Sequence, residues 1–562
     1  MLTKGKLKGY CEKEDGDETD FVALLKACAK KKDILRGTSL HADIVKRKLL
    51  ETKNPSLANT LISMYAKCGF LEKAQQVLED LPFRNVVSWS SLMAGYAQQG
   101  YGQMAINCFE RMRKEGLCPD AFAFSSALKA CASTGAIDKG KEIHDEIMTR
   151  GLLEEDIVLG TALVDMYAKC GFLAKAQQVL EELPERDVVT WSALIAGFVE
   201  HGESIRALCF FEKMQSEGFS PNSVTYISIL KACGSTRNIR KGEQIHEAII
   251  CKKLLEKDIV LGNALVDMYV KCGVLVKAQQ LLEKLPFRNV VSWSTLIAGY
   301  AEQGQSGKSL YCFKRMKHDG FSPNMVTFIC VLKACGHIGA IEKGKEIHDE
   351  IVNRGLLEKD IVLGTALVDM YAKCGSYVKA QQVLEELPYR DVISWSTLIS
   401  AYAERGQGHE ALVCFERMQR EGLTPDHITF LSVLTACCRS GLLEEAQTLF
   451  GNINQKYDIN LDLKYQTCMV LGLGLVGRFD EGLSVIRSMP SCGYFAIWLA
   501  VLGGCRKWAN VKFGKLAFHQ TIQLDPSCAS AYVLMSDIFL ASGMLDDAEK
   551  VEAMRLKYTK HP

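Results

Sequence analysis

Apolar residues recur at helical spacing in pairs of short stretches that glycine separates. Within residues 86–120, one apolar stripe starts at Trp89 and a second at Ala105, with Gly100 between them as a helix stop. Pro119 then closes the pair. No stretch alternates apolar and polar residues with a sustained period of two, so the pattern predicts pairs of helices rather than strands.

These helix pairs repeat with a period of 102 residues. Residues 86–187 return almost unchanged as 188–289 and as 290–391. Each unit divides into three related segments of 31, 35 and 36 residues, and each segment is one helix pair. Helix pairs of this kind bury their apolar faces against their neighbours. The sequence therefore predicts an all-α protein, a right-handed α-solenoid (superhelix) of stacked helix-turn-helix repeats.

Composition adds limits to this picture. The chain is 48% hydrophobic, yet it has no run of 18 uncharged apolar residues, so we expect no membrane contact. Its 67 basic and 66 acidic residues give a net charge of +1, which does not by itself suggest a polyanionic partner. A solenoid can nevertheless gather basic residues on one face.

Chemistry-bearing motifs are false leads. Many of the 22 cysteines recur with the 102-residue period, as in Lys-Cys-Gly at 67–69, and no two are three residues apart, so no CxxC motif exists. The His-x-Glu sequences at 144–146 and 348–350 lack the Pro-Cys-x-x-Cys of a zinc deaminase. A GxGxxG match at 472–477 has no βαβ context. We expect no catalytic residues, no metal and no cofactor.

The segments resemble the long, short and P-type motifs of the PLS class of pentatricopeptide repeat proteins. The resemblance rests on NTLISMYAKCG at 59–69, VVTWSALIAG at 188–197, and LKAC at 128–131 followed by GKEIH at 140–144. It implies these boundaries: an extension over 1–17; a repeat array over 18–426, with a long motif at 18–54, a short one at 55–85 and a P-type one at 86–120 before the 102-residue unit repeats; variant long and short repeats over 427–494; and tetratricopeptide-like E-type motifs over 495–562 without a DYW deaminase domain.

In this family each repeat faces one nucleotide of single-stranded RNA. The resemblance implies that the fifth and last residues of each motif read the base, and that apolar second residues sandwich it. The reading pairs are Asn59 with Asn85, Ser90 with Asp120, Thr161 with Asp187, Ser192 with Asn222, Asn263 with Asn289, Ser294 with Asn324, Thr365 with Asp391, and Ser396 with Asp426. The sandwiching residues are Val87, Val158, Val189, Val260, Val291, Val362 and Ile393, whereas Ser56 departs from the pattern.

Family pairing rules imply the target 5′-YGnGAnYAnGG-3′. Long motifs, which have Ile227 and Ile329 at the fifth place, are expected to read weakly. A structural alternative is open for the last residues, because Asn and Asp before a helix also serve as N-caps.

Two function classes remain open from the sequence. The first is an organelle RNA-binding protein, similar to C-to-U editing-site factors, that recruits a deaminase-bearing partner protein through its E-type region. The second is a tetratricopeptide-like scaffold for protein partners, although such arrays keep a single 34-residue period. The family resemblance favours RNA and implies a mitochondrion or chloroplast, while residues 1–20 show no targeting peptide.

Overall fold

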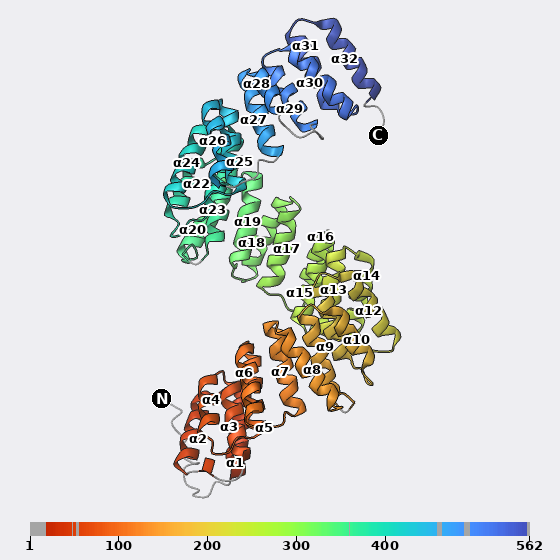
Figure 1. The fold of residues 1–562 in the computed structure, drawn as a ribbon, viewed down its shortest axis with the longest axis vertical. Coiled ribbons are helices and arrows are strands. Elements are labelled where there is room, and N and C mark those ends of the chain that lie inside the picture. Colours follow the sequence, from red (N-terminus) through yellow and green to blue (C-terminus); the bar gives the residue numbers. More distant parts are fainter. Residues whose placement is uncertain are drawn as a thin grey trace. The chain divides into compact units, whose positions relative to one another are not determined.

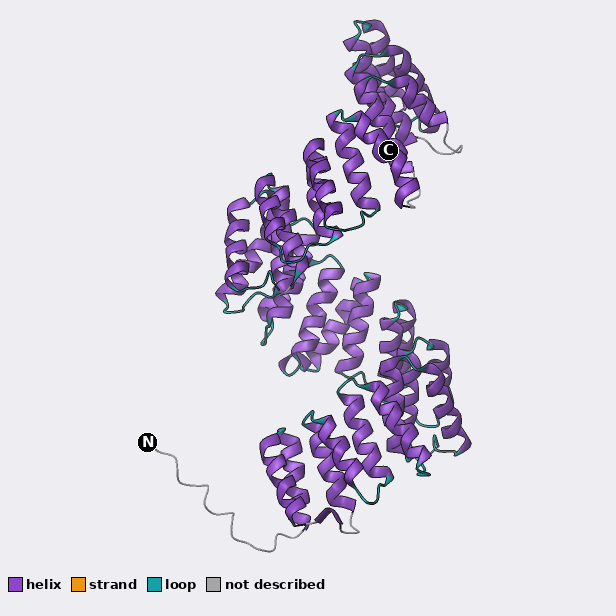
Figure 2. Cartoon of the chain, turned by 60° about the vertical axis from the view of Figure 1, so that its left-hand side comes forward, coloured by secondary structure: helices purple, strands orange, loops and turns teal. Residues whose placement is uncertain are grey.

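The computed structural model describes residues 18–47, 49–51, 55–154, 156–358, 360–457, 463–487 and 495–558. The expected extension over 1–17 lies outside these residues. The described residues form α-helices α1–α32 and two short 3₁₀ helices, without a strand (Figures 1 and 2). The predicted all-α fold of helix hairpins is confirmed. The chain divides into two compact units, residues 1–288 and 289–562.

The first unit contains eight helix hairpins, whose first helices have odd numbers. Their bounds are α1 Glu18–Lys31, α2 Ile34–Lys46, α3 Pro55–Lys67, α4 Leu71–Asp80, α5 Val86–Gln98, α6 Gly102–Lys114, α7 Ala121–Thr134, α8 Ile137–Thr149, α9 Ile157–Lys169, α10 Leu173–Glu182, α11 Val188–Glu200, α12 Ser204–Ser216, α13 Ser223–Thr236, α14 Ile239–Cys251, α15 Ile259–Lys271 and α16 Leu275–Lys284. The 3₁₀ helices are η1 Leu49–Glu51 and η2 Leu254–Glu256.

The second unit continues the same numbering. Its helices are α17 Val290–Glu302, α18 Ser306–His318, α19 Met325–Ile338, α20 Ile341–Asn353, α21 Ile361–Lys373, α22 Tyr377–Glu386, α23 Val392–Arg405, α24 Gly408–Arg420, α25 His427–Ser440, α26 Leu443–Tyr457, α27 Leu463–Val476, α28 Phe479–Arg487, α29 Phe495–Lys507, α30 Val511–Leu524, α31 Ala529–Ala541 and α32 Leu545–Tyr558.

First helices form the core of each unit. In the first unit, α7 contacts its own second helix α8, the preceding hairpin's α5 and α6, and the following first helix α9. Surrounded in this way, a first helix is apolar on most sides, and its largest residue is a fully buried tryptophan in α5, α11, α17 and α23. These tryptophans are Trp89, Trp191, Trp293 and Trp395. The 102-residue ladder is therefore a ladder of core positions.

Small residues let the first helices approach one another closely. A Cβ atom on Gly197 of α11 would lie 2.5 Å from the Cβ of Ala168 in α9. In the second unit, a Cβ on Gly504 of α29 would lie 2.9 Å from the Cα of Gly474 in α27. Gly474 belongs to the GxGxxG match, so helix packing explains this glycine without a nucleotide.

The end of the second unit has a core of its own over α27–α32. Tyr532 is buried in it, and its hydroxyl donates to the carbonyl oxygen of Pro526 at 2.9 Å. Trp498, a second residue that the E-type resemblance uses, packs against the same core. These hairpins extend the helical stacking of the second unit.

Candidate nucleic-acid interface

A row of exposed apolar side chains marks the starts of the first helices. The seven residues expected to sandwich bases all occupy the second position of a first helix, and 50–63% of each is exposed. Ser56 has the equivalent place in α3 and is also exposed. Because valine and isoleucine are usually buried, their repeated exposure at one helical position makes this row the candidate interface.

The long-type hairpins extend this row, which the sequence analysis missed. Their second residues are also large, apolar and 55–61% exposed: Phe122, Val224, Val326 and Ile428. The signal in the sequence was the apolar second residue itself. It was overlooked because Ile227 and Ile329, at the fifth place, predict that long motifs read bases weakly. We call these four residues and the seven sandwiching residues the apolar row. Its members lie on α5, α7, α9, α11, α13 and α15 in the first unit and on α17, α19, α21, α23 and α25 in the second.

The last residues of the motifs are helix N-caps, as the structural alternative held. All eight carboxylates and amides accept a hydrogen bond from the backbone N–H three residues later, as Asp187 does from Thr190 at 2.8 Å. The eight capping residues are Asn85, Asp120, Asp187, Asn222, Asn289, Asn324, Asp391 and Asp426. Each therefore lies two residues before a member of the apolar row.

Capping fixes which side-chain atom is left for a ligand. The oxygen Oδ1 makes every cap contact, so the atom that remains is Nδ2 in Asn222 and Oδ2 in Asp187. The first is a donor and the second an acceptor. An Asn repeat and an Asp repeat thus offer opposite hydrogen-bonding groups from the same backbone position.

The fifth residues of the P-type repeats are buried serines. Ser90, Ser192, Ser294 and Ser396 have only 1–7% of their surface exposed. Each Oγ lies 2.6–2.7 Å from the carbonyl oxygen four residues earlier, to which the hydroxyl can donate. Within the first unit, Ser192 Oγ also lies 3.5 Å from Asn222 Oδ1. In the second, Ser294 Oγ lies 3.4 Å from Asn324 Oδ1, so the structure brings two expected pairs together.

The fifth residues of the short repeats are half-buried and less uniform. Thr161 Oγ1 lies 2.7 Å from the hydroxyl of Thr190, which itself donates to Asp187 Oδ1 at 2.7 Å. Thr365 donates instead to the carbonyl oxygen of Ile361 at 3.0 Å. Asn59 and Asn263 each keep a buried Oδ1 without a hydrogen-bond partner among the described residues. Such an unpaired acceptor carries a desolvation cost that a ligand donor would remove.

One cavity in the second unit is lined by members of the apolar row together with a fifth residue. Its volume is about 290 Å³, and its lining includes Ile393 and Ile428 of the apolar row together with the fifth residue Ser396. Lys373 and Glu404 also line it. The cavity therefore lies between two consecutive members of the apolar row, where the family resemblance places a base.

Charged residues are sparse on the first helices. The first helices from α3 to α15, which have odd numbers, carry five lysines and no arginine. Two of these lysines, Lys169 and Lys271, form ion pairs with Asp165 and Asp267 on the same helices at 2.8 Å. The other three lysines are Lys67, Lys129 and Lys231. These helices thus carry no dense basic surface, and phosphate neutralisation is a small part of what they offer.

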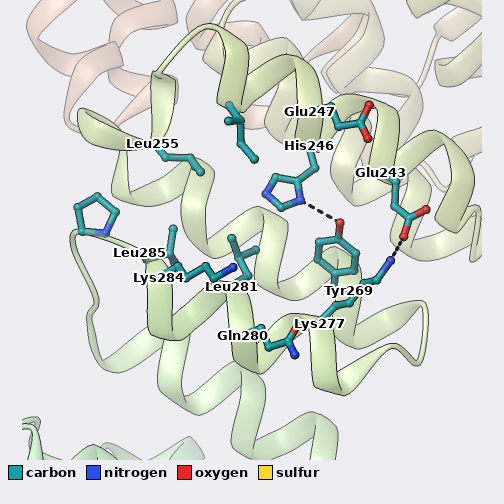
Figure 3. A pocket seen from close by; sticks show the side chains of 12 residues that line it. Glu243, His246, Glu247, Leu255, Tyr269, Lys277, Gln280, Leu281, Lys284 and Leu285 are labelled. Carbon is teal, nitrogen blue, oxygen red and sulfur yellow. Dashed lines mark hydrogen bonds and ion pairs between the residues drawn. The ribbon is translucent and has the colours of Figure 1, made fainter.

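A second cavity, about 470 Å³ in volume, is formed by α14, η2, α15 and α16 (Figure 3). His246 and Tyr269 meet across it, with Nδ1 and the hydroxyl 2.9 Å apart, and Lys277 forms an ion pair with Glu243 at its edge. Burial lowers the pKa of His246. None of its lining residues belongs to the apolar row or the expected reading pairs, so it is a separate feature of the second helices.

The first His-x-Glu sequence, at 144–146, has ordinary structural partners. His144 Nδ1 lies 2.9 Å from the Tyr167 hydroxyl, and Glu146 forms an ion pair with Arg150. Over the described residues, no group of three or more His, Cys, Asp or Glu side chains is arranged to hold a metal ion. Nor does any described helix have the length and apolar character to span a membrane.

Comparison with known proteins decides the family. The PPR repeat family matches residues 84–133, 186–235, 288–337 and 390–439. The PPR repeat matches residues 57–86, 161–188, 326–356, 365–392, 428–456 and 467–494. The chain belongs to the PPR repeat family. The predicted pentatricopeptide repeats are confirmed.

Curated relatives and solved structures agree with this membership. A chloroplastic pentatricopeptide repeat-containing protein of Arabidopsis thaliana is 33% identical over 96% of this chain, which spans 66% of that protein's length. A mitochondrial one from the same plant is 32% identical over 95% of this chain and 77% of its own. The crystal structure of PPR10 from maize, at 18% identity, covers 97% of this chain and 90% of its own with a TM-score of 0.53, and supports the PPR fold.

Proposed function

We propose that this PPR protein binds single-stranded RNA sequence-selectively, in the RNA metabolism of a mitochondrion or chloroplast. The apolar row carries the proposal. Eleven large apolar side chains are exposed at one helical position, and each of them lies two residues after a capping Asn or Asp. Aliphatic groups at that spacing suit the faces of successive bases, while the caps suit their edges.

Every member of the apolar row follows a capping Asn or Asp by two residues. The long repeats end in caps as well, because Asp156, Asp258 and Asp360 cap α9, α15 and α21. Within each unit, a nucleotide held between consecutive members of the row would therefore find a capping side chain at the start of the next first helix. This regularity is what a one-repeat, one-nucleotide arrangement requires.

The chemistry of the caps accounts for base selection. Asn leaves its Nδ2 donor and Asp its Oδ2 acceptor, as for Asn222 and Asp187. Guanine presents N–H donors at its Watson–Crick edge and suits an Asp repeat, whereas the N1 acceptor of adenine suits an Asn repeat. This agrees with the expected target 5′-YGnGAnYAnGG-3′. Further support comes from PPR10, which has been crystallised with an 18-nt psaJ RNA element.

Within RNA metabolism we assign the chain to C-to-U editing-site recognition. Residues 495–562, which resemble E-type motifs, would recruit a deaminase-bearing protein in trans, so the chain itself would supply recognition rather than catalysis. The relatives named chloroplastic and mitochondrial support an organelle. The alternative, a tetratricopeptide-like scaffold, predicts binding to proteins instead of RNA.

The test is a binding titration with the 11-nucleotide RNA, a version with its A and G positions exchanged, and the corresponding DNA. We expect the matched RNA to bind most tightly. Asn222→Asp should then shift the preference at the fifth nucleotide from A toward G and leave the other positions unchanged. Equal or absent binding of all three ligands would contradict the proposal and favour the scaffold.

A further inference from the structure

The residue after a member of the apolar row is third in its first helix, and in seven of these helices it has a hydroxyl that adopts one of two arrangements. In α5, α17 and α23 it is serine, which donates to the carbonyl oxygen of the capping residue at 2.7–2.9 Å. In α11, α13, α19 and α25 it is threonine, whose Oγ1 lies 2.7–2.9 Å from the capping Oδ1. The threonines are Thr190, Thr225, Thr327 and Thr429.

The threonine hydroxyl also reaches the preceding repeat. Thr225 Oγ1 lies 2.6 Å from Ser192 Oγ, and Thr327 Oγ1 lies 2.6 Å from Ser294 Oγ. Thr225 and Thr327 are both fully buried. Each therefore connects the fifth and last residues of one expected reading pair, although neither residue was singled out by the sequence analysis.

Counting protons shows how strongly the three side chains are linked. Ser192 and Thr225 have one hydroxyl proton each, and the acceptors within reach are the Val188 carbonyl oxygen, the partner hydroxyl and Asn222 Oδ1. Because the two hydroxyl oxygens lie 2.6 Å apart, one proton must lie between them, so that when Ser192 donates to Val188, Thr225 donates to Ser192. When Ser192 donates to Thr225, Thr225 donates to Asn222. Both arrangements connect Thr225 to the buried serine.

The second arrangement adds a second hydrogen bond to the amide orientation that the cap already sets for Asn222. Its Oδ1 then accepts from both the N–H and the hydroxyl of Thr225, each at 2.9 Å. An amide nitrogen cannot accept in place of that oxygen, so Nδ2 must face away from the helix end. Asn85, by contrast, accepts only from the Ser88 N–H, at 2.8 Å, because Ser88 donates to a backbone oxygen.

We propose that Thr225 is a positioning residue for base selection, which holds Asn222 with its donor toward the nucleotide and ties it to Ser192. Thr327 does the same for Ser294 and Asn324. The inference rests on the proposed RNA-binding function and adds a specificity determinant from the following repeat. Repeats followed by threonine should discriminate between bases more sharply than repeats followed by serine or alanine.

Thr225→Val tests the proposal, since it removes the hydroxyl and keeps the branched shape and the N–H that Asn222 caps. The measurement is the ratio of dissociation constants for RNAs with A or G at the fifth nucleotide. We expect this ratio to fall about five-fold, the effect of losing one ordinary hydrogen bond. Ratios at the other read nucleotides should stay the same, which a merely structural defect would not achieve.

Thr236→Val is the matched control on the same helix, because the Thr236 hydroxyl donates within its own helix to Ala232 at 2.9 Å. It should leave the ratio unchanged. Thr327→Val repeats the test at the eighth nucleotide, in the second unit. Should either first-unit variant fold poorly, this variant still decides the question.

Ala123→Thr tests the converse. Ala123 follows the pair Ser90 and Asp120, and its N–H donates to Asp120 at 2.7 Å, but its side chain has no hydroxyl. Adding one should sharpen the preference for G at the second nucleotide. If wild-type protein discriminates but Thr225→Val and Thr327→Val keep full discrimination, the positioning role is wrong and the RNA-binding function stands. If wild-type protein does not discriminate, the proposed function itself fails.

Discussion

First and second helices of the same hairpin have contrasting surfaces. On α11, Trp191 and Leu194 are fully buried and the exposed start offers Val189, whereas α12 presents Arg206 and Lys213 to solvent and to ion pairs. In this hairpin these charged side chains lie on the second helix, whereas the apolar side chain that is exposed at the same position in successive repeats lies at the start of the first helix. The regular exposure of one apolar residue at the same position of successive first helices supports the role in RNA binding that we propose for the apolar row.

The largest expected effect is on stability, and it distinguishes the layer of first helices from the layer of second helices. Trp191→Ala should lower the free energy of unfolding by about 3–5 kcal/mol, because it removes the largest side chain from a first helix that other helices surround. Ile205→Ala, on the second helix of the same hairpin and 71% exposed, should change it by less than about 0.5 kcal/mol. Urea denaturation measures both.

Equal losses in these two variants would contradict the view that the first helices form the core.

The sequence predicts this core well, because Trp191 recurs on a 102-residue ladder and the apolar stripes identify both helices of each hairpin. Helix ends were predictable for the same reason: Gly100 and Pro119 are chemical stop signals. Local residue chemistry is enough for these features.

The candidate site was less predictable, for reasons that particular residues make clear. Asn222 was expected both as a reader and as an alternative cap, and the structure shows the cap, which sequence cannot separate from a reading role. Ser192 is buried because α13 packs against α11 beside it, next to Thr225. The contact between Ser192 and Thr225 spans two repeats and depends on a hydroxyl direction, so no local pattern predicts it.

A smaller effect is expected on RNA affinity, which should depend on the first helices and not on the second. Val189→Ala should weaken binding of the matched RNA by about ten-fold, because part of one base-stacking surface is lost. Val189 is 55% exposed, so stability should hardly change. Fluorescence anisotropy gives the affinity, and a thermal melt of the same sample gives the stability.

Val276→Ala provides the matched control for this prediction. Val276 is 57% exposed in the same unit, yet it lies on the second helix α16. Its truncation should leave RNA affinity unchanged. A similar loss of affinity in both variants would mean that exposed valine in general, and not the apolar row, determines binding.

The smallest expected effect concerns the contacts between the two layers. Histidines of second helices meet tyrosines of the next first helices, as His144 meets Tyr167, and the same contact recurs at His41, His246 and His348. Burial lowers the pKa of His144, and nearby Lys175 adds to this, while Asp145 and Glu182 oppose it. The folded protein therefore holds this imidazole neutral where the unfolded chain binds a proton.

Stability should consequently be highest above the unfolded histidine pKa of about 6.5 and should fall as pH drops through that value toward the lower folded pKa. Thermal melts at pH 7.5 and 5.5 measure the fall. His144→Gln, which can still accept from Tyr167 but does not titrate, should make the fall shallower. An identical fall in this variant would show that other groups control it, and that the histidine contact joins the layers without making their association sensitive to pH.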